Sequence, residues 1–174
     1  MKIIISESQY RQIIESEKKI SDKKLKMYKD TIDELGLELA GHVLSKGLWE
    51  FIEMGLVEHY NEYLDLDGTP IKTLGNLKSV DGSVDLRNTS IEDLGNLTSI
   101  ENDLFLMFIP TIKSLGNLKS VGGDLYLNNC ENLTSLGNLN KVGGNLYLRN
   151  TPISRTMSKY DIKKKIKVRG EILI

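Results

Sequence analysis

A short phrase recurs along this 174-residue chain from about its first third to its end. Its most recognisable part is Leu-Gly-Asn-Leu, which begins at Leu74, Leu94, Leu115 and Leu136, in steps of 20, 21 and 21 residues. A fixed period of this length is typical of solenoids, in which each repeat forms one coil. Because one coil cannot bury its own apolar side, the pattern predicts a stack of coils.

Each repeat also predicts one short strand, marked by two apolar residues with one residue between them. The pairs are Leu64/Leu66, Val84/Leu86, Leu104/Leu106, Leu125/Leu127, Leu146/Leu148 and Ile172/Ile174. Side chains alternate across a strand, so these pairs face the interior and their neighbours face outward. The sequence therefore predicts an α+β fold, a short solenoid with one parallel sheet of about six strands at ~4.8 Å spacing.

Other apolar positions complete the interior of each coil. They are Ile71, Ile91, Ile112, Leu133 and Ile153 after the strand, and Val80, Ile100, Val121 and Val142 ahead of the next one. The dipeptides Asp81-Gly82, Gly122-Gly123 and Gly143-Gly144 follow the valines. They are predicted to form turns in which glycine supplies backbone conformations with positive φ.

The run Leu-x-Leu-x-x-Thr/Cys-x-Ile resembles the core of a leucine-rich repeat. Leu66, Thr69 and Ile71 fit this pattern, Cys130 occupies the Thr position of the fourth unit, and Ile109 replaces Thr in the third. The resemblance covers residues from about 63 to 153 and implies a leucine-rich-repeat-like solenoid. The phrase Leu-Gly-Asn-Leu, followed by Val-Gly-Gly-Asp-Leu, is also similar to short repeat proteins encoded by bacteriophages and some bacteria.

The pattern divides the chain into three regions. Residues 1–60 are predicted to be helical, residues 61–153 to form the coils, and residues 154–174 to form a C-terminal helix and a closing strand. Terminal units must cover the apolar ends of a solenoid, so both helical regions are interpreted as caps. Residues 1–60 have an alternative interpretation as a separate partner-binding module. A basic cluster at 163–169 is interpreted as the solvated face of the C-terminal cap.

Composition narrows the functional classes. The formal net charge is −1, which argues against the broad basic surface of a nucleic-acid-binding protein. The single cysteine indicates a reducing compartment, and no apolar run reaches the length of a membrane span. Met1 to Ser6 is too short for a signal peptide. The expected location is the cytoplasm of a bacterium or of a bacterium infected by a phage.

Residues that could carry catalysis or bind a metal are few. His42 lies in an apolar helical stretch, and His59 lies between Glu58 and Glu62 without the spacing of a known metal site. Cys130 has a structural interpretation in the repeat, and the glycines do not form a phosphate-binding loop. We therefore expect a non-enzymatic protein with no metal and no cofactor.

The outward face of the predicted sheet is the main candidate site. Phe105, Tyr126 and Tyr147 occupy equivalent positions in three successive coils, and Met107 lies beside them. The whole predicted protein-binding set is Asp65, Asp85, Arg87, Phe105, Met107, Tyr126, Asn128, Tyr147 and Arg149. An aromatic strip with a polar rim is typical of interfaces. Stacked aromatic residues also stabilise a sheet directly, so a purely structural role stays open.

These patterns predict a protein–protein interaction module that binds through its sheet face. The phage resemblance implies a partner such as a host defence factor that the protein blocks. One alternative is a virion or assembly component that self-associates. Another is an accessory subunit whose activity lies in the N-terminal helical region. Carbohydrate binding by the tyrosines and nucleic-acid binding by Lys163–Lys165 are further possibilities, the second with a steep salt dependence.

Overall fold

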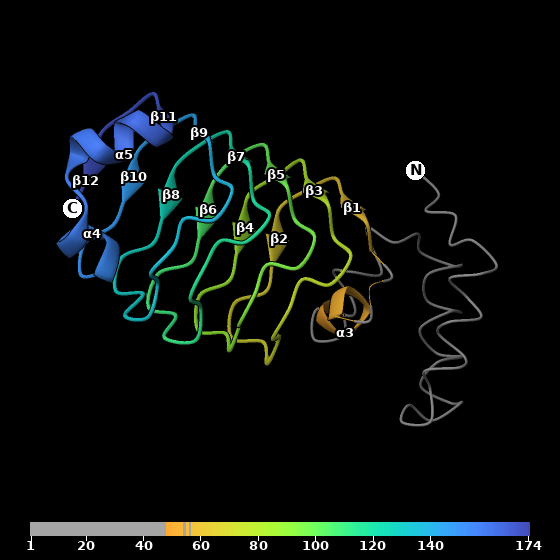
Figure 1. Cartoon of the computed structure of the whole chain (residues 1–174). Helices are drawn as coiled ribbons and strands as arrows, with labels where there is room; N and C mark the ends of the chain where they lie inside the picture. Colours follow the sequence, from red (N-terminus) through yellow and green to blue (C-terminus); the bar gives the residue numbers. More distant parts are fainter. Residues whose placement is uncertain (1–47, 54, 56) are drawn as a thin grey trace, which may run out of the picture.

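The structure is a computed structural model that describes residues 48–53, 55 and 57–174. The repeats form a solenoid of stacked parallel strands, and strand labels run in order along the stack from β1 and β2 to β11 and β12 (Figure 1). Each coil contributes one strand to each of two six-stranded sheets. We call them the odd sheet and the even sheet after their strand numbers.

The even sheet is the one that the apolar pairs predict. Its strands are β2 (Leu64–Asp65), β4 (Val84–Asp85), β6 (Leu104–Phe105), β8 (Leu125–Tyr126), β10 (Leu146–Tyr147) and β12 (Ile172–Leu173). All neighbours pair in parallel, and equivalent residues of successive coils are register partners, as Leu104 and Leu125 are. The predicted solenoid with a six-stranded parallel sheet is confirmed.

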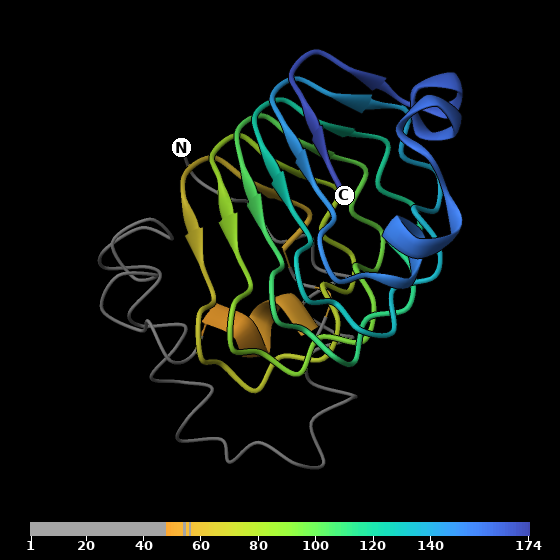
Figure 2. The ribbon, with the colours of Figure 1, turned by 90° about the vertical axis from the view of Figure 1, so that its left-hand side faces the viewer.

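The prediction of a single sheet is wrong, because a second sheet lies on another side of the same coils (Figure 2). Its strands are β1 (His59–Tyr60), β3 (Ser79–Val80), β5 (Ser99–Ile100), β7 (Ser120–Val121), β9 (Lys141–Val142) and β11 (Lys167–Val168). These strands span only two residues each. The even strands are equally short, but each begins an alternating apolar pair such as Leu125/Leu127. An odd strand carries one buried apolar residue, such as Val80, and so shows no alternation in the sequence.

The core fills the inside of the coils. The apolar pairs of the even sheet are buried except for Ile174, which is 40% exposed. The residues that follow the pairs are buried too, and so are the odd-sheet residues Val80, Ile100, Val121 and Val142. The two leucines of each Leu-Gly-Asn-Leu phrase are also buried in the first three coils. Leu136, in the last such phrase, is only partly buried, because cap helices and not another coil cover it.

The prediction that the glycines of the turn dipeptides have positive φ is wrong. Positive φ occurs at the glycine of every Leu-Gly-Asn-Leu phrase, between 52° and 57°, and not in the predicted turn dipeptides. In those dipeptides the constraint is space. A Cβ on Gly122 would collide with the Glu101 carbonyl oxygen, and one on Gly143 with the Gly122 carbonyl oxygen. At these two glycines the preceding coil lies so close that a Cβ would force the backbone to shift.

Helix α3 (Leu48–Glu53) lies at the first end of the stack. Ile52 is fully buried in the common core. The Glu53 carboxylate accepts a hydrogen bond from the backbone N–H of Lys72, and the Asn76 side-chain amide donates to the Gly55 carbonyl oxygen at 3.1 Å. This helix therefore covers the first coil. The predicted helices within residues 1–47 lie outside the described residues.

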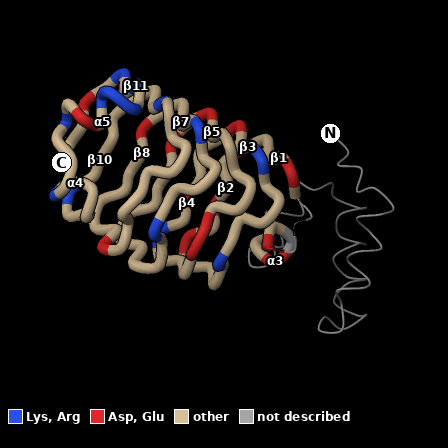
Figure 3. Tube along the Cα trace, viewed as in Figure 1, with Lys and Arg blue, Asp and Glu red and all other residues tan. Residues whose placement is uncertain are grey.

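Two short helices close the other end, α4 (Pro152–Thr156) and α5 (Lys159–Lys165). They take the place of one Leu-Gly-Asn-Leu segment, where the sequence predicted one helix. Thr151 caps α4 by accepting from the Ser154 backbone N–H at 3.1 Å, and Ser158 and Asp161 form a capping box on α5. Basic residues gather around α5 and β11 (Figure 3), and those of α5 are exposed, as the solvated-face interpretation expects.

Within the described part of the chain, no helix is both long enough and apolar enough to cross a membrane.

Candidate protein-binding face

The even sheet turns one face outward, and a stack of three aromatic rings runs along it. The ring centroids of Phe105 and Tyr126 are 5.0 Å apart with an interplanar angle of 12°, and those of Tyr126 and Tyr147 are 4.5 Å apart at 7°. All three side chains are partly exposed. The parallel register of β6, β8 and β10 places these residues opposite one another, as the repeat predicted. We call these three residues the aromatic ladder.

Arg87 covers the end of the ladder nearest to β4. Its guanidinium carbon lies 5.7 Å from the centroid of the Phe105 ring. The same guanidinium donates to both carboxylate oxygens of Asp85, with Nε at 2.9 Å from Oδ1 and a terminal nitrogen at 2.5 Å from Oδ2. The face therefore already holds one cation against an aromatic ring and a carboxylate.

The prediction that Asp85 is exposed on the rim is wrong. Its residue is only 1% exposed, because Arg87 and Tyr63 lie over it, and the Tyr63 hydroxyl donates to Oδ2 at 3.1 Å. Burial opposes ionisation, but the hydrogen bonds from Arg87 outweigh it and hold the pKa of Asp85 below its usual range. Asp85 thus holds Arg87 in position and has almost no exposed surface of its own.

The remaining predicted residues lie around the ladder. Asp65 and Arg149 are exposed, whereas Met107 and Asn128 are partly buried. The Asp65 carboxylate accepts from the backbone N–H of Asp67 at 3.1 Å, and the Asn128 side-chain oxygen accepts from the backbone N–H of Arg149 at 3.0 Å. These contacts fix the backbone and leave the Asp65 and Arg149 side chains at the surface.

A second column of polar side chains runs beside the ladder and was not predicted. Asp103 accepts a hydrogen bond from the backbone N–H of Asp124 at 2.7 Å, and Asp124 accepts from that of Asn145 at 2.6 Å. Asp124 also accepts from the Tyr126 hydroxyl at 3.1 Å. Burial, followed by this hydrogen bond, raises the pKa of Tyr126 to about 12. The column ties successive coils together and orients a ladder residue.

Phe108 is a further aromatic residue that the sequence reasoning missed. It follows Met107 directly, is 66% exposed, and has a φ of 63°. The equivalent residues of other coils are Gly68, Asn88, Asn129 and Asn150, all with positive φ. An alignment of the coils at this position would have identified Phe108, because it departs from a Gly/Asn pattern.

The other chemical candidates have structural partners. Glu58 forms a 2.8 Å salt bridge with Lys78, and His59 Nδ1 lies 2.7 Å from the Ser79 hydroxyl. Within residues 48–53, 55 and 57–174, no three His, Cys, Asp or Glu side chains are grouped to hold a metal ion. His42 lies outside the described residues. His59 and Glu58 therefore both have partners in the neighbouring strand β3 or directly before it.

Cys130 is buried and hydrogen-bonded inside the stack. In other coils a threonine hydroxyl donates to its own strand, as Thr69 does to the Leu66 carbonyl oxygen at 2.7 Å. Ile109 has no hydroxyl, and the Leu106 carbonyl oxygen of that coil accepts instead from the Cys130 sulfur at 2.9 Å. Burial raises the pKa of the Cys130 thiol to about 11. The thiol substitutes for a missing threonine and is poorly suited to nucleophilic chemistry.

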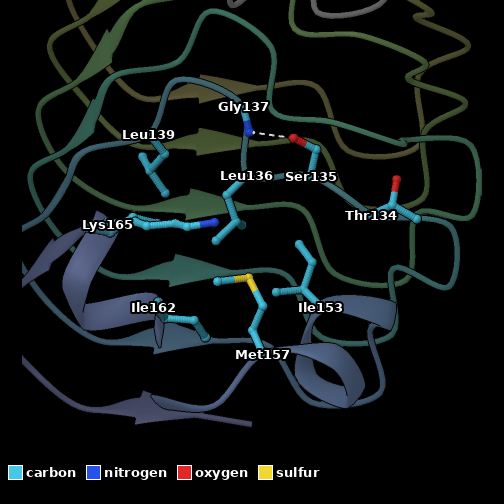
Figure 4. Close-up of a pocket in the computed structure, with 10 residues that line it drawn as sticks. Thr134, Ser135, Leu136, Gly137, Leu139, Ile153, Met157, Ile162 and Lys165 are labelled. Atoms are coloured by element: carbon cyan, nitrogen blue, oxygen red, sulfur yellow. Dashed lines mark hydrogen bonds between the residues drawn. The ribbon is translucent and has the colours of Figure 1, made fainter. Parts of the chain in front are cut away.

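A pocket of about 170 Å³ lies where the last coil meets the cap helices (Figure 4). Leu136, Met157 and Ile162 give it apolar walls, and Lys165 lies at its border. The Gly137 backbone N–H donates to the Ser135 hydroxyl at 3.0 Å on the coil side. The pocket results from two short helices covering a segment that elsewhere is covered by an equivalent coil.

The fold and its outward face define a solenoid repeat protein with an exposed aromatic ladder. Comparison with protein-family models, with curated proteins and with solved structures finds no match in any of the three.

Proposed function

We propose that this chain is a non-enzymatic protein-binding module that contacts another protein through the outward face of its even sheet. The observation that carries the proposal is the aromatic ladder, which lies on the side of the sheet away from the core. Aromatic residues with a polar rim are enriched in protein interfaces and depleted from free surfaces. The resemblance to leucine-rich repeats supports a solenoid of this kind.

The residues of the face have separate roles in this proposal. Phe105, Tyr126 and Tyr147, with Met107 beside them, are the apolar anchors. The exposed charges of Asp65 and Arg149, together with the Asn128 amide, set the orientation of the partner. Asp85 acts through Arg87, which it holds beside the ladder. Interfacial charges of this kind contribute more to orientation and association rate than to affinity.

The repeat phrase supports a narrower proposal for the partner. Because it is similar to phage-encoded repeat proteins, we place the protein in the cytoplasm of a bacterium or a phage-infected bacterium. The partner class is then a host factor, such as a defence component that the protein blocks. Self-association in a virion remains the alternative within the binding class, since an isologous pairing of the ladder would also bury it.

The test is affinity capture from a bacterial lysate with the wild type and with the triple variant Phe105→Ser/Tyr126→Ser/Tyr147→Ser. Tyr160→Ser is the matched control, because Tyr160 is a 66% exposed aromatic residue on the cap helix α5. Circular dichroism first confirms that each variant folds. A protein held by the wild type and the control but lost by the triple variant supports the proposal. Equal retention by all three leaves the ladder with only a stabilising role.

A further inference from the structure

Phe108 occupies a fixed backbone position of the repeat. The backbone N–H of Phe108 donates to the Asn128 carbonyl oxygen of the next coil at 2.9 Å. Gly68 and Asn129 make the equivalent bonds at 3.0 and 2.9 Å. The chain leaves the even sheet here in the left-handed conformation, and φ is 54° to 67° throughout the column.

A phenylalanine is a costly residue at this position. Bulky side chains rarely adopt positive φ, whereas Gly and Asn adopt it readily. The side chain gains little burial in return, since it is 66% exposed. It also interrupts a column of amides in which Asn150 donates to Asn129 at 2.8 Å. Strain that the fold does not require points to a role outside folding.

The position of Phe108 links it to the proposed interface. It directly follows Met107, which lies on the even-sheet face in the same coil as Phe105. Phe108 therefore extends the apolar strip beyond the end of its strand. On the β4 side of this strip the Arg87 side chain is 47% exposed, but its charge is paired with the Asp85 carboxylate.

The surrounding charge selects the kind of partner. The carboxylates of the even-sheet face, apart from the paired Asp85, are Asp65, Asp67, Asp103, Asp124 and Glu171, and its basic side chain apart from Arg87 is Arg149. A second copy docking by the same face would bring like charges together, which opposes association. A partner with Lys or Arg around an apolar contact would be complementary.

We infer that Phe108 is the anchor of an interface for a protein segment that combines apolar residues with Lys or Arg. The inference rests on the proposed function and deepens it. Truncation of an anchor of this kind commonly costs more than tenfold in affinity. Replacing Phe108 with Asn, the residue at three equivalent positions, relieves the strained conformation without disturbing the core.

The experiment selects a displayed library of random linear peptides on the folded full chain and then measures the selected peptides against variants. We expect peptides rich in apolar residues with Lys or Arg, bound about tenfold or more weakly by Phe108→Asn and equally by the control Tyr160→Asn. We also expect the thermal midpoint of Phe108→Asn to rise by about 2–4 °C. If Phe108→Asn binds the peptides more weakly although it is more stable, the loss of binding cannot be a consequence of a weakened fold.

Several outcomes overturn the inference. A library that yields no specific peptides, or acidic peptides only, contradicts the proposed partner chemistry. A lowered thermal midpoint shows that Phe108 serves the fold. Peptides bound equally by Phe108→Asn but lost by the ladder triple variant contradict the anchor and leave the proposed face intact. Peptides retained by every variant contradict both.

Discussion

The buried carboxylate of Asp85 and the guanidinium of Arg87 form a paired unit, with hydrogen bonds to both carboxylate oxygens. The two residues are separated by one position on the same face of the even sheet. The pair keeps the Arg87 side chain over the ring of Phe105. A local ion pair thus joins the charged end of the face to the aromatic ladder.

Removing this ion pair should weaken the fold in a pH-dependent way. Asp85→Asn is expected to lower the free energy of unfolding by about 1–3 kcal/mol at neutral pH, because charged hydrogen bonds are lost from a buried site. The pKa of Asp85 in the folded state lies below its unfolded value of about 4. Its stabilisation is therefore complete above about pH 4 and is lost as the pH falls through the folded-state pKa.

Urea unfolding across the acid range measures this effect. The difference between wild type and Asp85→Asn should shrink as the solution is acidified. Asp81→Asn, at an exposed aspartate, is the control and should change stability by less than about 0.5 kcal/mol. If the difference in the free energy of unfolding stays constant down to the lowest pH, the stabilisation by Asp85 does not depend on the charge of its carboxylate.

Replacement by alanine should have different effects at Gly68, which has a positive φ and open space, and at Gly143, which lies against the preceding coil. At Gly68 a Cβ meets nothing within 4 Å, so Gly68→Ala is expected to cost only about 1–2 kcal/mol for its left-handed backbone. At Gly143 a Cβ collides with the preceding coil, and the bond from its N–H to the Val121 carbonyl oxygen, 2.8 Å, must lengthen. Gly143→Ala should therefore cost about 3 kcal/mol or more. Chemical denaturation measures the free energy of unfolding of both variants. A smaller loss for Gly143→Ala than for Gly68→Ala would contradict the close stacking of coils at Gly143.

The thiol of Cys130 should be unreactive while the coils stay stacked. It is buried, and its pKa of about 11 leaves it almost fully protonated at pH 8. We expect a chromogenic disulfide reagent to label it slowly in buffer and rapidly in concentrated urea. Labelling in buffer at the rate of a free thiol in solution would mean that the stack opens readily at this coil.

The sequence predicted the parts of the fold that repeat with a clear period. The pair Leu125 and Leu127 has equivalents in every coil, so the even sheet, its register and the stacking of Tyr126 on Tyr147 followed. The odd sheet was missed because a strand such as Ser79–Val80 carries a single buried apolar residue and therefore shows no alternation. The glycine roles were exchanged because a dipeptide suggests a turn, while close contact between distant backbones leaves no local signal.

The candidate site was predicted less completely, since alternation assigns a face but not an exposure. Asp85 has an outward position, yet its neighbours Arg87 and Tyr63 cover it, and only three-dimensional packing reveals this. Phe108 lies just beyond the strand and is not part of the alternating apolar pair Leu104/Leu106, so the strand pattern did not identify it. Its signal was the comparison of one position across coils, in which Asn129 and Asn150 mark the ordinary residue.

Site-specific photo-cross-linking in bacterial cells tests directly whether the even-sheet face binds another protein. A photoreactive phenylalanine derivative replaces Met107 on the even-sheet face or, as the control, Tyr160 on α5. We expect a discrete protein adduct from position 107 and none from position 160. Adducts from position 160 alone, or equal adducts from both positions, would contradict the assignment of the even-sheet face as the binding surface.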